Sequence, residues 1–195
     1  MDEKEATRER ILAAAGARFM HYGYQKTTMA EIARDLDMST GNLYRFFPSK
    51  LDIAEAIALF HEKDEDALLE RLTENLEDPV EAYRNFCRTV LEETFRVIAE
   101  SRKVFEIAQA ISSERPQFAN RRLATERIFI ARILQAGIEK GQFAPVDDIA
   151  FTAEMLQCAT MKFRYPQLSN CFNLAMLRRE LEGVLDLLFV GLRAR

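Results

Sequence analysis

The 195-residue sequence is poor in the residues that interrupt regular structure. Its 7 glycines and 5 prolines are too few for a loop-rich β-sandwich or a low-complexity chain. No stretch approaches about 18 uncharged apolar residues, so we expect no membrane span. The charged residues 1–5 have no apolar segment behind them, so we expect no signal peptide and a cytoplasmic protein.

Residues suited to metal or redox chemistry are also scarce. The 3 cysteines (Cys87, Cys158 and Cys171) form no Cys-x-x-Cys pair, and the 2 histidines lie far apart. A glycine loop for phosphates and the spacing of a carboxylate–histidine metal site are missing as well. We therefore expect no metal site, no cofactor and no enzyme.

The charge is slightly negative and unevenly distributed. Against 27 Lys and Arg stand 31 Asp and Glu, a net of -4. Residues 1–50 hold 8 basic and 7 acidic side chains, whereas residues 51–195 hold 19 and 24. A broad basic surface for nucleic acid is thus excluded, but the first 50 residues could bind DNA through a few placed contacts.

Apolar residues recur at steps of three and four along the whole chain, which predicts an all-α fold of about nine helices. Strand-like alternation never lasts. The expected helices cover about residues 7–22, 28–36, 39–47, 49–75, 78–98, 103–111, 116–140, 147–165 and 173–193. The seventh could also end at Gly137.

Residues 28–47 have the pattern of a helix-turn-helix. Thr28 and Glu31 have capping-box spacing at the start of the first short helix. Asp37, Met38 and Ser39 leave room only for a turn, Ser39 can cap the next helix, and Pro48 must end it. Two short helices joined by such a turn are typical of DNA-binding proteins.

The second of these helices has two different faces at about 100° per residue. Its inward stripe is Leu43, Phe46 and Phe47, and its outward face is Gly41, Asn42, Tyr44 and Arg45. Arginine can bond guanine, asparagine can bond adenine, and glycine lets a backbone approach the duplex. Hydroxyls such as those of Thr40 and Tyr44 can reach phosphates. The alternative is a three-helix subdomain whose outer face is only solvated.

The residues themselves favour DNA binding. The Thr-Met-Ala-Glu-Ile-Ala-Arg run from Thr28, and the Met-Ser-Thr-Gly-Asn-Leu-Tyr-Arg-Phe-Phe-Pro-Ser-Lys run from Met38, closely resemble the motif of the tetracycline-repressor (TetR) family. The similarity covers roughly residues 7–60. It implies phosphate contacts at Thr28, Thr40, Tyr44 and Lys50, and a base-reading surface of Gly41, Asn42 and Arg45. Ser39 would be a cap with a phosphate contact as a second role.

The resemblance also implies a domain organisation. A helix-turn-helix domain (residues 1–50, completed by the first turn of the helix from residue 49) would precede a ligand-binding and dimerisation domain (residues 51–195). Members of the family are homodimers, usually through a bundle of their last two helices. Most repress transcription and leave a pseudo-palindromic operator when a small molecule binds. Two departures are Asp37, where Gly or Asn is frequent, and an acidic arm before the first helix.

Two sets of residues are candidates for the later domain. Leu156, Phe163, Leu177, Leu181, Leu185 and Leu188 form helical stripes that suit a dimer interface, with packing inside one chain as the alternative. An effector pocket could be lined by Phe86, Phe105, Gln109, Phe129, Met155 and Thr160. That composition weakly favours a hydrophobic effector, and the alternative is an ordinary core.

The expected function is a repressor with operator DNA, a second copy of itself and a small effector as partners. Two other readings stay open at this point. One is an activator, or a regulator without an effector. The other is a helical module for protein interactions.

Overall fold

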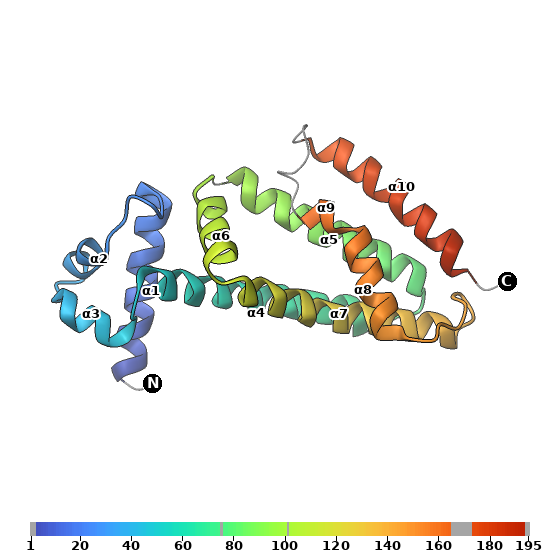
Figure 1. Cartoon of the computed structure of the whole chain (residues 1–195), viewed down its shortest axis with the longest axis horizontal. Helices are drawn as coiled ribbons and strands as arrows, with labels where there is room; N and C mark the ends of the chain where they lie inside the picture. Colours follow the sequence, from blue (N-terminus) through green and yellow to red (C-terminus); the bar gives the residue numbers. More distant parts are fainter. Residues whose placement is uncertain (1–2, 75, 101, 165–172, 194–195) are drawn as a thin grey trace. The chain divides into compact units, whose positions relative to one another are not determined.

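A computed structural model describes residues 3–74, 76–100, 102–164 and 173–193 (Figure 1). These ranges contain ten helices and no strand, which confirms the all-α prediction. The helices are α1 (Glu3–Tyr22), α2 (Met29–Asp35), α3 (Thr40–Phe46), α4 (Lys50–Glu74), α5 (Pro79–Glu100), α6 (Arg102–Glu114), α7 (Pro116–Glu139), α8 (Ile149–Ala159), α9 (Met161–Arg164) and α10 (Leu174–Leu192). Within the described part of the chain, no helix is long and apolar enough to cross a bilayer.

The helix count exceeds the predicted nine because one expected helix is split. Figure 1 shows α9 directly after α8, where a single helix up to residue 165 was predicted. The break is at Thr160, whose backbone has φ -101° and ψ 6°. Its hydroxyl donates to the carbonyls of Leu156 (3.0 Å) and Gln157 (3.2 Å). The N–H of Thr160 is likewise shared between the carbonyls of Leu156 (3.3 Å) and Gln157 (3.2 Å), the tightened geometry that is frequent at the end of a helix.

Helix ends follow the signals in the sequence. Thr28 caps α2 in a complete capping box with Glu31, and Ser39 caps α3. Gly23 after α1 and Gly141 after α7 have positive φ, at 93° and 69°, the conformation that glycine adopts without penalty.

The chain divides into two compact units. The N-terminal unit comprises residues 1–65 with 100–119, and the C-terminal unit comprises residues 66–99 with 120–195. These bounds differ from a division after residue 50, because the first part of α4 and all of α6 belong with the N-terminal helices. Arg115 is one reason: its guanidinium pairs with Asp52 (2.5 Å) and with Glu55 on α4.

The N-terminal unit has its own hydrophobic core. Side chains from α1, α2, α3, α4 and α6 meet in it, the most buried being Ile11, Ala15, Phe19, Ile32, Leu43, Phe47, Ile53 and Ala54. Because α2 and α3 are only seven residues long, this burial provides most of their stability.

The core of the C-terminal unit corrects the predicted dimer interface. Leu156, Phe163, Leu177, Leu181 and Leu185 are at most 4% exposed in the single chain, and Leu188 is partly buried against them. They pack on α5 and α7 residues such as Phe86 and Ile130. These residues therefore stabilise the fold of the single chain. Helices of the same chain already cover them, so they are not available to a partner.

Candidate nucleic-acid interface

The turn between α2 and α3 is short and tightly bonded. Asp37 has φ 54°, the left-handed conformation expected at this position. The N–H of Met38 then donates to the carbonyl of Ala33 (2.9 Å). Aspartate tolerates this conformation better than most residues, so the turn forms without glycine.

The two faces of α3 are arranged as the periodicity indicated. Leu43 and Phe47 are buried (0% and 1% exposed), and Phe46 is half-buried. The exposed side chains of α3 are Gly41, Asn42, Tyr44 and Arg45. A Cβ added to Gly41 would meet nothing within 4 Å, so the space outside this helix is open. The outer surface of α3 can thus approach another molecule closely.

The start of α3 is set by Ser39. Its Oγ accepts a hydrogen bond from the Asn42 N–H (3.1 Å), which makes Ser39 a helix cap first of all. Thr40 follows in the first helical turn and is half-buried.

Thr28 is exposed, but its polar groups are already used within the chain. Its N–H and its hydroxyl both donate to Oε2 of Glu31, each at 2.9 Å. These bonds lower the pKa of Glu31, first through the Thr28 hydroxyl and then through the backbone N–H. A phosphate at the start of α2 would therefore compete with the carboxylate of Glu31.

Arg18 is a supporting residue that the sequence reading missed. Its guanidinium pairs with Asp35 (2.8 Å) and Glu31 (3.2 Å), and its side chain is only 10% exposed. It thereby joins α1 to both ends of α2. The i, i+4 spacing of the two carboxylates was visible in the sequence, but their partner 13 or more residues away was not.

Lys50 points its ammonium into the protein. Nζ donates to the carbonyls of Tyr24 (2.7 Å) and Thr27 (2.8 Å) and lies 4.2 Å from the centre of the Tyr24 ring. Burial lowers the pKa of Lys50. The side chain thus joins the start of α4 to the loop before α2, and it offers a phosphate less than a free lysine would.

Arg8 on α1 lies against the end of α3. Its guanidinium carbon is 4.2 Å from the centre of the Phe47 ring, and Nη1 donates weakly to the Phe46 carbonyl (3.5 Å). Arg45 is the exposed cation in the last turn of α3 itself. Positive charge is thus concentrated at this end of the helix.

The predicted effector residues do not gather in one place. Phe86, Phe129 and Thr160 are buried in the core of the C-terminal unit. Phe105 and Gln109 lie on α6 in the N-terminal unit, and Met155 is 43% exposed on α8. The predicted set therefore combines buried core residues of the C-terminal unit with residues of α6 in the other unit and an exposed residue of α8.

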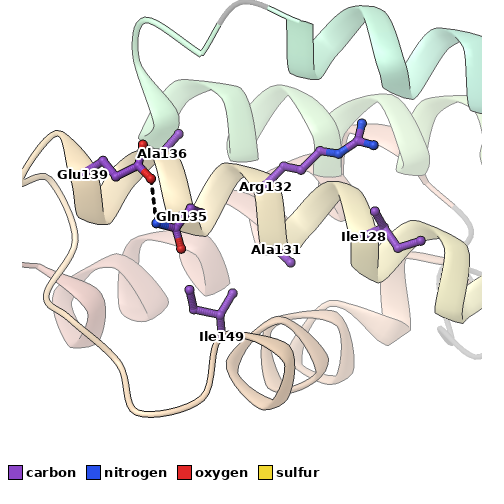
Figure 2. A pocket seen from close by; sticks show the side chains of 7 residues that line it. All are labelled: Ile128, Ala131, Arg132, Gln135, Ala136, Glu139 and Ile149. Atoms are coloured by element: carbon purple, nitrogen blue, oxygen red, sulfur yellow. Dashed lines mark hydrogen bonds between the residues drawn. The ribbon is translucent and has the colours of Figure 1, made fainter.

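A wide surface hollow lies between α7 and the start of α8, with a volume of about 530 Å³. In Figure 2, Ile149 enters it from α8, and the other lining residues come from α7: Ile128, Ala131, Arg132, Gln135, Ala136 and Glu139. Gln135 donates to Glu139 (2.6 Å), so these two polar groups satisfy each other. Its polar side chains are exposed to solvent, and the hollow is open on one side. In the described ranges, no group of His, Cys, Asp and Glu could hold a metal ion.

The fold and the helix-turn-helix define a DNA-binding transcriptional regulator. A family model described as "Bacterial regulatory proteins, tetR family" matches residues 11–68, and a "Tetracyclin repressor-like, C-terminal domain" model matches residues 79–185. The chain therefore belongs to the TetR family of transcriptional regulators. Because this family consists of regulators, neither an enzyme nor a mere interaction module is a tenable reading.

Similar proteins agree with this assignment. The transcriptional regulator UidR of Escherichia coli is 28% identical over 157 residues, which are 79% of this chain and 78% of UidR. Among solved structures, GusR of Salmonella enterica is 27% identical, with a TM-score of 0.58 and coverage of 95% and 98%. A TetR-family regulator from Pectobacterium atrosepticum is 21% identical, covers 99% and 97%, and has a TM-score of 0.75, which shows the common fold.

Proposed function

We propose that this protein is a homodimeric repressor that leaves a pseudo-palindromic operator when a small molecule binds. The observation that carries the DNA-binding part is the outward face of α3, where Asn42 and Arg45 are exposed on a firmly packed helix. A repressor of this kind acts on chromosomal DNA, so the proposal includes a cytoplasmic location.

On the DNA, α3 would lie in the major groove. Gly41, Asn42 and Arg45 would face the bases, with Arg45 bonding guanine and Asn42 bonding adenine. Thr40, Tyr44 and the cap residues Thr28 and Ser39 would contact phosphates. Lys50 would donate only its third N–H to a phosphate, because the other two already donate to backbone carbonyls.

The dimer would form through the outer faces of α8 and α10. Large apolar side chains are exposed there, namely Phe151 and Met155 on α8 and Met176, Leu187 and Val190 on α10. Leu187 and Val190 are 76% and 73% exposed, one turn apart, on the side of α10 away from its buried stripe. Gly183 on the same side has open space around it and would allow close packing. This surface replaces the buried leucines as the proposed interface.

Release by a small molecule is supported by structures with the same fold. RolR was solved with resorcinol, and Thermus thermophilus FadR, a TetR-family repressor, was solved with lauroyl-CoA. The alternative of an activator, or of a regulator without an effector, predicts the same DNA contacts. Measuring transcription from the operator with and without the protein would distinguish a repressor from an activator.

The test of DNA binding is selection of bound duplexes from a random pool. We expect a two-fold symmetric site with half-sites an integral number of helical turns apart. Arg45→Ala should weaken binding to that site by about 1–3 kcal/mol and reduce the base preference at one position. Arg132→Ala on α7 should leave both the affinity and the base preference unchanged. Unchanged affinity in the Arg45 variant would contradict the docking of α3.

A further inference from the structure

The side chain of Arg8 on α1 is held in place by the end of α3. Its guanidinium carbon lies 4.2 Å from the centre of the Phe47 ring, and Nη1 donates to the carbonyl of Phe46 at 3.5 Å. Figure 1 shows the end of α3 beside the N-terminal half of α1. Phe47 is 1% exposed, so the ring that supports the guanidinium is fixed by the core. A planar cation stacked on a fixed ring loses little conformational freedom when it binds a ligand.

Most of the hydrogen-bonding capacity of Arg8 is unused. A guanidinium group carries five N–H donors, and within the described ranges Arg8 makes only the long bond to Phe46. Its other nitrogen atoms are accessible to solvent. No described carboxylate pairs with Arg8, although Glu5 lies one turn before it on α1. The side chain is thus ordered but open to an acceptor from outside the chain.

The carboxylates near the helix-turn-helix already have cationic partners. Arg18 pairs with Glu31 (3.2 Å) and Asp35 (2.8 Å) of α2. Arg115 pairs with two carboxylates in the first part of α4. Asp37 lies in the turn before α3 and therefore at the opposite end of that helix. The end of α3 thus keeps its positive charge.

The length of α3 is close to the width of the groove that it would enter. Its seven residues span about 10 Å at a rise of about 1.5 Å per residue, and the major groove is about 12 Å wide. A groove that receives α3 therefore brings phosphates near both ends of the helix. The start of α3 offers the hydroxyls of Ser39 and Thr40, and the end offers the guanidinium of Arg8.

We propose that Arg8 is a further DNA-binding residue and that its guanidinium donates to a backbone phosphate next to the end of α3. The planar fork of arginine suits two oxygens of one phosphate. Phe47 supports the guanidinium from one side, and the carbonyl of Phe46 holds one of its N–H groups. The inference rests on the proposed docking of α3 and extends the DNA interface from the helix-turn-helix to α1.

The alternative is that Arg8 only stabilises the end of α3. A cation near the last carbonyls of a helix is favourable in itself. Such a support would influence how α3 presents its side chains, and hence the base preference, but it would not change the number of phosphates that the protein neutralises. A phosphate contact does the reverse, because it carries no sequence information and contributes to the salt dependence of binding.

The experiment measures the affinity of the full-length protein for the selected operator and for a random duplex by fluorescence anisotropy, between about 50 and 200 mM NaCl. Arg8→Gln removes the charge and keeps an N–H for the carbonyl of Phe46. We expect the slope of log K against log salt concentration to be lower by about 0.9 for each bound subunit. Over this salt range, the parent should therefore lose about threefold more affinity per subunit than the variant. The random duplex should show the same change, and the base preference should stay as in the parent.

Two further variants serve as controls. Arg10→Gln removes the same charge from the same helix, but Arg10 is exposed about 200° around α1 from Arg8, so its slope should equal that of the parent. Arg8→Lys keeps the charge and removes the planar fork. Its slope should also be close to that of the parent, with an affinity between those of the parent and Arg8→Gln.

Three results would overturn the proposal. The first is a parental slope in Arg8→Gln, and the second is an equal decrease in Arg8→Gln and Arg10→Gln, which would be a general effect of net charge. The third is an altered base preference with a parental slope, which would assign Arg8 to the support of α3. The docking of α3 is tested separately by Arg45→Ala. A normal effect of Arg45→Ala together with a parental slope in Arg8→Gln would retain the docking and reject only the contact of Arg8.

Discussion

Nζ of Lys50, the first residue of α4, lies 2.7 Å from the carbonyl oxygen of Tyr24, in the loop between α1 and α2. A second bond to Thr27 places the same ammonium next to Thr28, the cap of α2. The residue that the family motif assigns to DNA thus also shapes the loop that presents α2.

Lys50→Met should lower the free energy of unfolding by about 1–2 kcal/mol, because two carbonyls lose a charged donor that is partly screened by water. Urea unfolding measures this loss, with the exposed Lys26→Met as the control. The salt dependence of operator binding tests the second role. If the slope of log K against log salt concentration is lower by about one in the variant, Lys50 also neutralises a phosphate. An unchanged slope would indicate that Lys50 acts only through the loop.

Gly41→Ala should separate stability from DNA binding. The added Cβ meets nothing in the free protein, and alanine favours the helix by roughly 0.5 kcal/mol or more, so the variant should be as stable or more so. The same atom would stand between α3 and the duplex and weaken operator binding about tenfold or more. Gly16→Ala in α1 is the control, with an ordinary 3.7 Å contact to Ile57. Full operator affinity in the Gly41 variant would show that the duplex does not approach this point.

Leu187→Glu should convert the protein to a folded monomer. The side chain is 76% exposed, so the change leaves the core of the chain intact but buries a charge in the proposed interface. Sedimentation measures the mass, and circular dichroism the helix content. Met20→Glu, an equally drastic change on the exposed surface of α1, should stay dimeric. A dimer of unchanged stability in the Leu187 variant would place the interface elsewhere.

The contact between α5 and α10 should respond to acid. Glu182 accepts from Nε of Arg88 (2.5 Å) and Nη1 of Arg84 (2.7 Å), and the bond from Arg88 is the main reason why its pKa is lowered. Its stabilising effect is therefore complete above the pKa of the unfolded chain, about 4.3, and disappears as the pH falls through the lower folded value.

Glu182→Gln tests this dependence. The variant should be less stable than the parent by about 0.5–1 kcal/mol at pH 7, since the carboxylate is partly exposed. The difference should shrink as the pH decreases below about 4. Thermal unfolding at several pH values measures it, and a constant difference would contradict the assignment.

The helix-turn-helix was predictable because its signals are local. Thr28 and Glu31 are three residues apart, as are Ser39 and Asn42, and each pair forms the predicted cap. The inward position of Leu43 followed from helical periodicity. The inward turn of Lys50 was not predictable, because its carbonyl partners lie 23 and 26 residues away.

The C-terminal unit shows the limit of the same reasoning. The stripe of Leu177, Leu181 and Leu185 correctly indicated a buried face, but periodicity does not tell whether a helix of the same chain or of another chain covers it. The single expected helix that includes Thr160 was wrong, because the backbone leaves the helical conformation at that residue.

By itself, the sequence determined the all-helical fold, the helix-turn-helix and the TetR family, since periodicity, capping and a motif act over short distances along the chain. Only the tertiary structure decided which apolar stripes its own helices cover and which remain exposed on α8 and α10. It also decided that α6 belongs with the N-terminal helices. These features depend on side chains that are distant in sequence, and packing alone brings them together.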